Sequence, residues 1–503
     1  MQFLYLFMVL AGMAVFGRLI YIQFVQGPYW RDKATSLTSV MQKIEAARGN
    51  IIADDGSYLA ISLPQYELRM DLLAPGISEE LFRKNLDSLA LGLAKITGQN
   101  TYGQFKQKLK NARAEGNRYL LVAKGLRFTQ VKEIQELPIL SLGRNSGGCI
   151  IESYTSRKKP YGSLAARTIG KPNEDGHGVG IELAYDSYLK GKEGLRLMEK
   201  LSGSVWRPAE SENTVEPEDG LDIVSTIQPD IQEVVQYELA FQLAKNDAEH
   251  GTAVVMETKT GYIRAIVNLM RGSDGKYYEA YNYAVGESTE PGSTMKLMTM
   301  LALLEDGLIK LGDSIETGNG RYRFYDHVLR DSKEGGHGTV TIQHAFEVSS
   351  NIAMARLVWD AYKDQPDKFI QHFKRLGLDQ PLGLEIPGEG KPLVKSPGHE
   401  TWSGLTIPMM AIGYELQHTP LHVLALYNAI ANNGTMMKPK FVQEIQRRGK
   451  TIERFEPEVL HKKICSESTL KALQQLLEGV VEHGTAKNLN DHAIRIAGKT
   501  GTV

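Results

Sequence analysis

Cysteine is scarce in this sequence, with two residues, Cys149 and Cys465, far apart among 503. They form neither a disulfide framework nor the paired spacing of a zinc site. An excess of one charge is also missing, because 58 basic and 59 acidic residues give a formal net charge of -1. A balanced charge gives no general attraction to nucleic acid, so no nucleic-acid partner is expected. The sequence also contains no glycine-rich phosphate-binding loop, no internal repeat and no low-complexity tract.

Basic residues are missing from the start of the chain, which is almost wholly apolar before Arg18. The apolar stretch resumes after Arg18 and reaches Val25, which is long enough to cross a bilayer. A cleaved signal peptide is the alternative, but a basic leading region and a clean small-residue cleavage site are both missing, so an uncleaved anchor is favoured. The positive-inside rule alone would place the side carrying Arg18, Arg31 and Lys33 in the cytoplasm. Charge alone therefore does not decide the orientation, and a few residues before Met1 are expected to be missing from the sequence.

The length predicts two or three domains, and hydrophobic residues at 42% can supply their cores. Residues from about 42 to 220 are predicted to form a mixed, extended region, with a strand over 48–53 that runs into an Asp-Gly turn. An amphipathic helix is predicted over 78–97, where Ser78 caps it and Gly98 ends it. A second, more basic helix is predicted from about 102 to 113, and its lysines are expected to form a solvated face.

A new domain is predicted to begin at about Gly220. Pro229 opens a predicted helix, and the turn Lys259-Thr-Gly261 predicts a hairpin. Strands are predicted over 221–227, 252–257, 262–268 and 494–502, and helices dominate from about 295 to 480. Strands on both sides of a helical insert predict an α+β domain with one sheet.

The most informative stretch is Glu290-Pro-Gly-Ser-Thr-Met-Lys296, which comes directly before an apolar helix. Pro291 and Gly292 predict a turn, and Ser293 is expected to cap the helix that follows. Lys296 lies one turn further on the same face. A desolvated amine loses proton affinity, so it can take the proton of a neighbouring hydroxyl. Ser293 and Lys296 are therefore a candidate nucleophile and base.

The Ser-x-x-Lys pattern alone is weak, because the sequence contains it five times. Two later motifs, Ser349-Ser-Asn351 and Lys499-Thr-Gly501, complete a set that penicillin-recognising enzymes share. Decoys exist for these as well, in Ser211-Glu-Asn213 and Lys259-Thr-Gly261. The copies at Ser293, Ser349 and Lys499 alone occur in the required order with room for a helical domain between them. The other Ser-x-x-Lys copies start at Ser156, Ser187, Ser273 and Ser468.

With this triplet, the chain resembles the class B penicillin-binding proteins, which are membrane-anchored D,D-transpeptidases of peptidoglycan synthesis, and most of all their division-specific septal type. The resemblance covers nearly the whole chain. Further matching motifs are Arg48-Gly-Asn-Ile51, Gly180-Ile-Glu182 with Tyr185-Asp186 and Gly191, Ser225-Thr-Ile-Gln228, Ile412-Gly-Tyr414, Thr419-Pro-Leu421 and Asn433-Gly434. It implies an anchor over 1–25, a pedestal (dimerisation) domain over 26–219 and a transpeptidase domain over 220–503. Because the family's sheet continues further, a truncation at Val503 is expected.

The resemblance implies a role for each motif residue. Ser293 would attack a terminal D-Ala-D-Ala bond and form an acyl-enzyme, and Lys296 would take its proton. Ser349 would relay a proton to the leaving amine, and Asn351 would orient Lys296 and the substrate. Lys499 would lower the pKa of Lys296 and, with Thr500, Gly501 and Thr502, bind the substrate's carboxylate and backbone. The N–H groups of Ser293 and Thr502 would form the oxyanion hole.

The same resemblance implies the partners and the location. The donor would be a stem peptide ending in D-Ala-D-Ala, the acceptor an amine of a second stem peptide, and β-lactams would acylate Ser293. A polytopic membrane glycosyltransferase and division proteins are expected partners, and the catalytic domain is expected outside the bacterial cytoplasmic membrane. No cofactor and no metal are expected. His418 and His422 have a ligand-like spacing, but Pro420 lies between them and no acidic partner follows, so a structural role is favoured.

Three alternatives remain. An elongation-type transpeptidase would share the chemistry, while a membrane-bound β-lactam sensor or a non-catalytic division scaffold would not. The long pedestal region argues against a sensor, and the complete motif triplet argues against a scaffold without activity.

Overall fold

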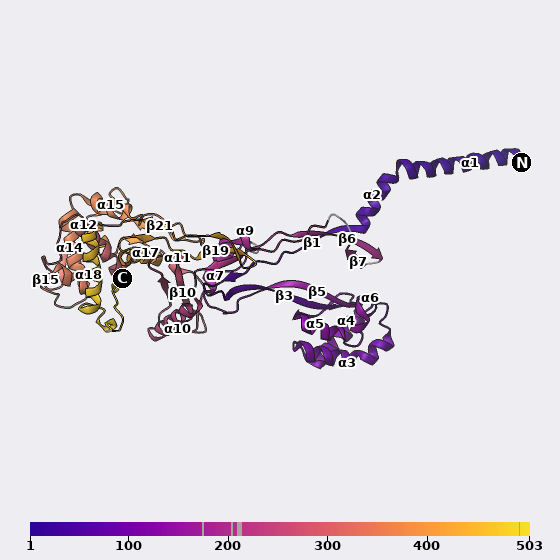
Figure 1. The fold of residues 1–503 in the computed structure, drawn as a ribbon, viewed down its shortest axis with the longest axis horizontal. Helices are drawn as coiled ribbons and strands as arrows, with labels where there is room; N and C mark the ends of the chain where they lie inside the picture. Colours follow the sequence, from indigo (N-terminus) through magenta and orange to yellow (C-terminus); the bar gives the residue numbers. More distant parts are fainter. Residues whose placement is uncertain (174–175, 203–204, 209–213, 492, 503) are drawn as a thin grey trace. The chain divides into compact units, whose positions relative to one another are not determined.

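The computed structural model describes residues 1–173, 176–202, 205–208, 214–491 and 493–502. The chain forms an α+β fold with two compact units, and it passes between them several times (Figure 1). The first unit consists of residues 1–49, 62–156 and 187–221, and the second of residues 50–61, 157–186 and 222–503.

The first unit begins with an apolar helix. Helix α1 (Gln2–Ile20) continues as a π-helical turn (Tyr21–Val25), and this helix is long and apolar enough to cross a membrane. At 1.5 Å per residue its 24 residues span ~36 Å, more than the ~30 Å of a hydrocarbon core. Its side chains are exposed along its whole length, which suits a lipid environment.

Two sheets follow in the first unit. Helix α2 (Gly27–Thr38) leads into β1 (Ser39–Ile44), which pairs antiparallel with β6 (Gly194–Ser202), and β6 pairs with β7 (Val205–Pro208). The second sheet joins the C-terminal part of β3 (Tyr58–Met70) to β4 (Leu120–Leu126) and β5 (Cys149–Lys158).

Three helices pack against strands β3 and β4 and complete the core of the first unit. They are α3 (Glu79–Thr97), α4 (Tyr102–Ala114) and α5 (Phe128–Gln135). The predicted helix over 78–97 is confirmed, with the Ser78 side chain as its cap and Gly98 in the left-handed conformation at its end. The buried residues of α3 lie on one face because they recur at helical spacing, as in Phe82, Leu86, Leu89 and Leu93.

The second unit contains two main sheets, so the expected single sheet is wrong. In one sheet β20 (Lys450–Arg454), β19 (Val442–Arg447), β8 (Asp222–Ser225) and β2 (Ile51–Ile52) lie in that order, and β2 also pairs with the start of β3. The other is β11 (Tyr277–Tyr278), β10 (Ile263–Arg271) and β9 (His250–Met256). Strand β8 cannot join this second sheet because β2 and β19 occupy both of its edges.

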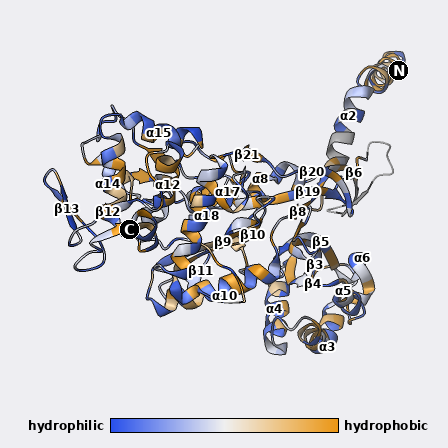
Figure 2. Cartoon of the chain, turned by 60° about the vertical axis from the view of Figure 1, so that its left-hand side comes forward, coloured by the Kyte–Doolittle hydropathy of each residue, from blue (hydrophilic) through white to orange (hydrophobic). Residues whose placement is uncertain are grey.

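The hairpin predicted around Lys259-Thr-Gly261 is confirmed, since β9 and β10 flank it and Gly261 has a positive φ of 76°. Helix α10 (Pro229–Lys245) packs against β9 and β10. Figure 2 shows hydrophobic residues predominating in β10 and in α17 (Pro420–Ala431). The Thr226 hydroxyl links the two sheets, because it lies 2.8 Å from the oxygen of Ile263 in β10 and 2.9 Å from that of Lys440, just before β19.

The helical part of the second unit positions the motifs. It consists of α11 (Tyr283–Gly286), α12 (Lys296–Glu305), α13 (Ile342–Glu347), α14 (Asn351–Tyr362), α15 (Pro366–Arg375), α16 (Thr406–Met410), α17 and α18 (Glu467–Glu482). Short strand pairs connect these helices: β12 (Ser314–Glu316) with β15 (Thr339–Thr341), β13 (Arg321–Phe324) with β14 (His327–Arg330), β16 (Leu393–Val394) with β17 (Leu416–Gln417), and β18 (Met436–Met437) with β21 (Val459–His461). Helix α12 is nearly all apolar and is buried from Lys296 to Leu303.

The motif Gly180-Ile-Glu182 has a packing explanation. Gly180 begins the short helix α8 (Gly180–Ala184) with φ 67°, and a Cβ there would lie 2.3 Å from the oxygen of Thr168. The Glu182 carboxylate is fully buried and accepts a hydrogen bond of 2.8 Å from Arg157 Nε. A buried carboxylate needs such a partner, because an unpaired charge away from water is costly. This motif therefore stabilises the second unit locally.

Candidate active site

Ser293 lies in a single 3₁₀ turn, Gly292–Met295, that leads directly into α12. The prediction that its side chain caps the helix is wrong, because the hydroxyl of Thr294 makes the local bond, donating to the oxygen of Pro291 at 2.7 Å. Ser293 Oγ makes no hydrogen bond with any residue that the structure describes. The residue is almost completely buried, with 6% of its surface exposed. Its hydroxyl does not stabilise the helix through a hydrogen bond with the described residues.

Lys296 begins α12 and is completely buried. Its Nζ lies 2.7 Å from the oxygen of Ser349, 3.1 Å from Ser349 Oγ and 2.7 Å from Asn351 Oδ1. Burial, together with the positive charge of Lys499, lowers the pKa of Lys296 to about 7, while the charge of Asp331 opposes this shift. An amine with this pKa is neutral in a large fraction of molecules near pH 7, which a general base requires.

Ser349 occupies a strained position just before α14. Its φ is 58°, in the left-handed region that residues other than glycine rarely adopt. The next residue, Ser350, caps α14 by accepting a hydrogen bond of 3.1 Å from the N–H of Ala353. The helix therefore starts at Asn351, and this start directs Asn351 Oδ1 and the Ser349 main-chain oxygen to the same amine. Backbone strain of this kind costs about 1–3 kcal/mol and is typical of functional sites.

Lys499 reaches the same place from the C-terminal part of the chain. Its Nζ donates a 2.8 Å hydrogen bond to Ser349 Oγ and lies 5.8 Å from the centre of the Phe346 ring. Burial lowers its pKa to about 8. A Cβ on Gly501 would lie 3.2 Å from Thr294 Cγ2, so this segment runs against the turn that carries Ser293. The structure thus brings Lys296 and Lys499 to the hydroxyl of Ser349, and Asn351 to the amine of Lys296.

The segment that carries Lys499 is not a strand, so the prediction over 494–502 is wrong. A strand requires a ladder of main-chain hydrogen bonds, and β9, at the edge of its sheet, pairs only with β10 among the described residues. The segment is held instead by single bonds, from the N–H of Gly498 to Leu477 O at 3.1 Å and between the hydroxyls of Thr485 and Thr500 at 2.7 Å.

The expected oxyanion hole also differs from the structure. The N–H of Ser293 donates to the main-chain oxygen of Thr502 at 3.3 Å. This N–H is therefore occupied, and an acyl oxygen would have to displace the Thr502 carbonyl before it could bind there. Gly501 and Thr502 are exposed, so such a displacement would not open a packed core.

Asp331 is a site residue that the motifs did not predict. Its carboxylate accepts hydrogen bonds from the Ser350 hydroxyl at 2.9 Å and from the N–H of Ile352 at 3.0 Å. The neighbouring main-chain oxygen of Arg330 accepts a bond of 3.0 Å from the Asn351 amide. Asp331 thus fixes the start of α14 from outside the helix. No sequence pattern marks it, because it lies in a loop and its partners become neighbours only in the fold.

The family resemblance predicts that fluorescent penicillin labels this site covalently, and we expect Asp331→Asn to slow that labelling by roughly 10- to 100-fold, because a shift of about 1 Å in positioning groups can cost that much. The amide would offer one oxygen where the carboxylate offers two, so the start of α14 would be held less firmly. Stopped-flow or gel-based labelling rates measure the effect. Asp326→Asn, an exposed acidic residue in the β13–β14 turn, is the matched control. Equal rates for the two variants would rule out the positioning role of Asp331.

Gly413 supports the turn of Ser293. Its φ is 88°, its oxygen accepts a 3.0 Å bond from the N–H of Gly292, and a Cβ at Gly413 would lie 1.9 Å from Gly292 O. Gly434 has a similar φ of 86°, but a Cβ at Gly434 would have ordinary space, because the nearest atom, Leu470 Cδ2, would lie 3.8 Å away. The two glycines therefore share the conformational requirement, and Gly413 alone of this pair adds a close approach.

The change Gly413→Ala is expected to lower the unfolding temperature clearly more than Gly434→Ala. Both changes cost about 1–2 kcal/mol for a left-handed alanine, and the former must also move the main chain of Gly292. Differential scanning fluorimetry measures both, and covalent labelling of the protein by penicillin should fall only in Gly413→Ala. Similar unfolding temperatures would contradict the close approach.

The two histidines with ligand-like spacing make main-chain contacts. His418 Nε2 lies 2.8 Å from Leu378 O, and His422 Nε2 lies 3.1 Å from Gln380 O. Burial lowers the pKa of His418 to about 4, so its ring is neutral. No group of three metal-binding side chains occurs in the part of the chain that the structure describes. The decoy motif Ser211-Glu-Asn213 lies outside the described residues.

Comparisons with known proteins identify the family of this chain. Residues 251–503 match the family described as the penicillin binding protein transpeptidase domain, and residues 43–225 match the penicillin-binding protein dimerisation domain. The chain therefore belongs to the class B penicillin-binding proteins. Its motifs and relatives are of the type represented by the Escherichia coli FtsI protein.

Three individual comparisons show how far the similarity extends. Penicillin-binding protein PbpB of Mycolicibacterium smegmatis is 30% identical over 70% of this chain, but the match spans only 55% of PbpB. Peptidoglycan D,D-transpeptidase FtsI of Escherichia coli K12 is 24% identical over 97% of this chain and 78% of its own length. Penicillin Binding Protein 2X of Streptococcus thermophilus has the same fold, with a TM-score of 0.71 and 21% identity over 91% of this chain and 69% of that structure.

Proposed function

We propose that this protein is a serine-type peptidoglycan D,D-transpeptidase that cross-links stem peptides through an acyl-enzyme on Ser293. The observation that carries the proposal is the contact of Lys296 Nζ and Lys499 Nζ with the same Ser349 hydroxyl, at 3.1 and 2.8 Å. The relative FtsI of Escherichia coli, named a peptidoglycan D,D-transpeptidase, supports the same reaction.

The geometry suggests how protons would move. Lys499 donates to Ser349 Oγ and Lys296 Nζ lies 3.1 Å from the same oxygen, so the proton of Ser349 would be free to point to the leaving group. Lys296 would take the proton of Ser293 as this attacks the carbonyl of D-Ala-D-Ala. The proton would then pass through Ser349 to the leaving D-Ala amine. An amine of a second stem peptide would repeat these steps in reverse, which forms the cross-link and frees Ser293.

Substrate binding is assigned to the Lys499 segment. The ammonium of Lys499, with Thr500 beside it, would bind the terminal carboxylate of the donor, since charge-assisted hydrogen bonds are about twice as strong as neutral ones. Gly501 and Thr502 would pair with the peptide backbone. A β-lactam presents a similar carboxylate and a strained amide, so it would acylate Ser293 in place of the donor.

The arrangement in the cell is also a proposal. The helix Gln2–Val25 would anchor the chain in the cytoplasmic membrane, residues 26–219 would form a pedestal, and residues 220–503 would form the transpeptidase domain on the outer side. A membrane glycosyltransferase would supply the glycan strands. We propose a role at the division septum, and a tagged copy located along the side wall in growing cells would assign the protein to elongation instead.

The decisive experiment is mass spectrometry of the purified full chain after incubation with benzylpenicillin. The intact mass should rise by one penicillin per chain, and peptide mapping should place the addition on Ser293. A thioester that mimics D-Ala-D-Ala should then give a cross-linked product when an amine acceptor is added. Absence of the adduct, or an adduct at another residue, would refute the proposal. An adduct without turnover of the thioester would favour a β-lactam sensor.

A further inference from the structure

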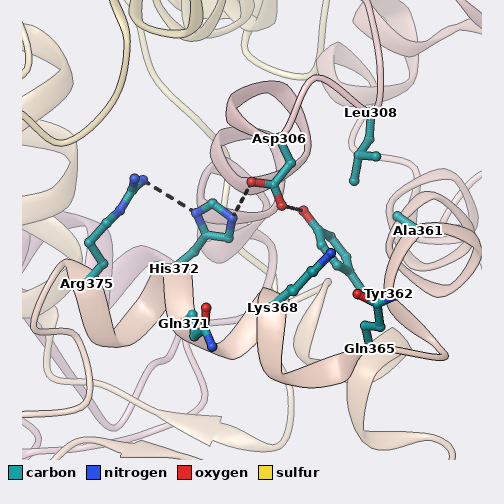
Figure 3. Close-up of a pocket in the computed structure, with 9 residues that line it drawn as sticks. All are labelled: Asp306, Leu308, Ala361, Tyr362, Gln365, Lys368, Gln371, His372 and Arg375. Atoms are coloured by element: carbon teal, nitrogen blue, oxygen red, sulfur yellow. Dashed lines mark hydrogen bonds and ion pairs between the residues drawn. The ribbon is translucent and has the colours of Figure 1, made fainter.

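A polar pocket lies at the C-terminal ends of the two helices whose first residues are the motif residues Lys296 and Asn351. Helix α12 starts at Lys296 and is followed by Asp306, and helix α14 starts at Asn351 and ends at Tyr362. Helix α15 forms the remaining wall, and the cavity has a volume of about 570 Å³ (Figure 3). Its lining residues are Asp306, Leu308, Ala361, Tyr362, Gln365, Lys368, Gln371, His372 and Arg375.

A chain of hydrogen bonds that links Tyr362, Asp306, His372 and Arg375 forms the floor of this pocket. Tyr362 Oη donates to Asp306 Oδ2 at 2.8 Å, and His372 Nε2 lies 3.0 Å from Asp306 Oδ1. Arg375 Nη2 lies 3.5 Å from His372 Nδ1. A guanidinium can only donate, so Nδ1 is the acceptor, and Nε2 carries the hydrogen that it donates to Asp306. Asp306 is the one carboxylate among the described lining residues, and both of its oxygens are therefore already used.

Hydrogen-bond donors remain in excess on the wall. The ammonium of Lys368 makes no hydrogen bond or ion pair with any residue that the structure describes. Among those residues, Arg375 uses Nη2 alone, towards His372 and towards Ile464 O at 3.3 Å. Lys368, His372 and Arg375 project from α15 to the side on which Asp306 lies (Figure 3). Lys368 and Arg375 are exposed, so water hydrates these donors. A ligand that replaces this water must be rich in hydrogen-bond acceptors.

The charge of the pocket lining also favours an anionic ligand. Lys368 and Arg375 carry two positive charges, whereas Asp306 carries one negative charge and already accepts hydrogen bonds from Tyr362 and His372. A further carboxylate that interacts with Arg375, that of Glu305, accepts hydrogen bonds from the N–H of Ser466 at 2.9 and 3.1 Å. Lys368 and Arg375 begin about 10 Å apart along α15, since they are seven residues apart in a helix.

We propose that this pocket binds a small molecule with two or more anionic oxygen groups, held between Lys368 and Arg375. The volume falls within the roughly 300–1,000 Å³ of small-molecule sites. Carboxylate and phosphate groups share the chemistry that the wall requires. The site does not depend on the proposed reaction at Ser293, because it lies at the far ends of α12 and α14 and none of the motif residues lines it.

The test uses the full chain in detergent, with citrate and pyrophosphate as separate probes and sodium chloride at matched ionic strength as the salt control. Isothermal titration calorimetry should show saturable binding of at least one probe, and the stronger probe identifies the anionic group. Lys368→Ala and Arg375→Ala should each weaken this binding about 10-fold or more. Neither change removes Asp306 or Tyr362 from the floor of the pocket, and the unfolding temperature without probe checks that both variants fold.

Lys374→Ala is the matched control, because Lys374 is exposed on the same helix but does not line the pocket. It should keep the affinity of the unchanged protein. The proposal fails if neither probe binds beyond the salt control. It also fails if Lys374→Ala weakens binding as much as Lys368→Ala, since binding would then reflect the general charge of α15.

Discussion

Ser293→Ala should abolish covalent labelling by fluorescent penicillin while leaving the unfolding temperature within about 1–2 °C of the unchanged protein. The hydroxyl makes no hydrogen bond with the described residues, so its removal should change the free energy of unfolding little. Its oxygen is the atom that would carry the acyl group, so labelling should be lost. Labelling should therefore fall to background at any penicillin concentration, rather than shift to higher concentration.

The chain supplies its own control for this experiment. Ser468 and Lys471 repeat the Ser-x-x-Lys spacing on α18, and there the Lys471 ammonium pairs with Glu467 at 2.8 Å on an exposed surface. Ser468→Ala should label at the full rate, because the pairing raises the pKa of Lys471, which therefore stays protonated and cannot act as the base. If Ser293→Ala were still labelled at the wild-type rate, Ser293 could not be the nucleophile.

These two serines show what a motif can and cannot predict. Local spacing gives the same pattern at Ser293 and Ser468, and within the sequence only the order of the later motifs distinguishes them. The meeting of Lys296, Ser349 and Lys499 follows from that order and from the family resemblance. Asp331 could not be predicted, because its partners Ser350 and Ile352 become neighbours only through the loop after β14.

In the fold as well, local features could be predicted from the sequence, whereas contacts between distant segments could not. Helix α3 was predictable to within a residue, since capping and apolar spacing are local properties that Ser78, Gly98 and the buried leucines all carry. The grouping of strands was not, because pairing depends on which edges are free. Strand β8 looked like part of the β9–β10 sheet, yet its edges are used by β2 and β19. The residues from 494 to 502 looked like a strand, but those that the structure describes lack the ladder that would make them one.

The rate of acylation should depend on pH through both lysines. Burial and Lys499 lower the pKa of Lys296 to about 7, so below that pH the amine is mostly protonated and the rate should fall about tenfold per unit. In the proposed role, Lys499 would have to stay protonated to bind the carboxylate, and burial lowers its pKa to about 8. The expected profile is a narrow bell with its maximum between these values, measured as the second-order rate of labelling by penicillin.

Lys296→Met tests the base directly, because it keeps an unbranched side chain of similar length in a fully buried position and removes the amine. We expect a loss of about 10²- to 10⁴-fold in acylation rate at pH ~7.5, the usual contribution of a general base, and loss of the acidic limb of the bell. A rate within a factor of about three of the unchanged protein would mean that another group accepts the Ser293 proton.

Lys499→Gln separates the two roles of the second lysine. Removing a positive neighbour favours the charged form of Lys296, so the pKa of Lys296 should rise and the acidic limb of the profile should move to higher pH. The alkaline limb should disappear, because glutamine does not titrate, and the overall rate should fall because the carboxylate loses its ionic partner. An acidic limb that stays at the pKa of about 7 would mean that burial alone sets the pKa of Lys296. The direction of this shift can be read even though the variant is slow, since it depends on the shape of the profile and not on its height.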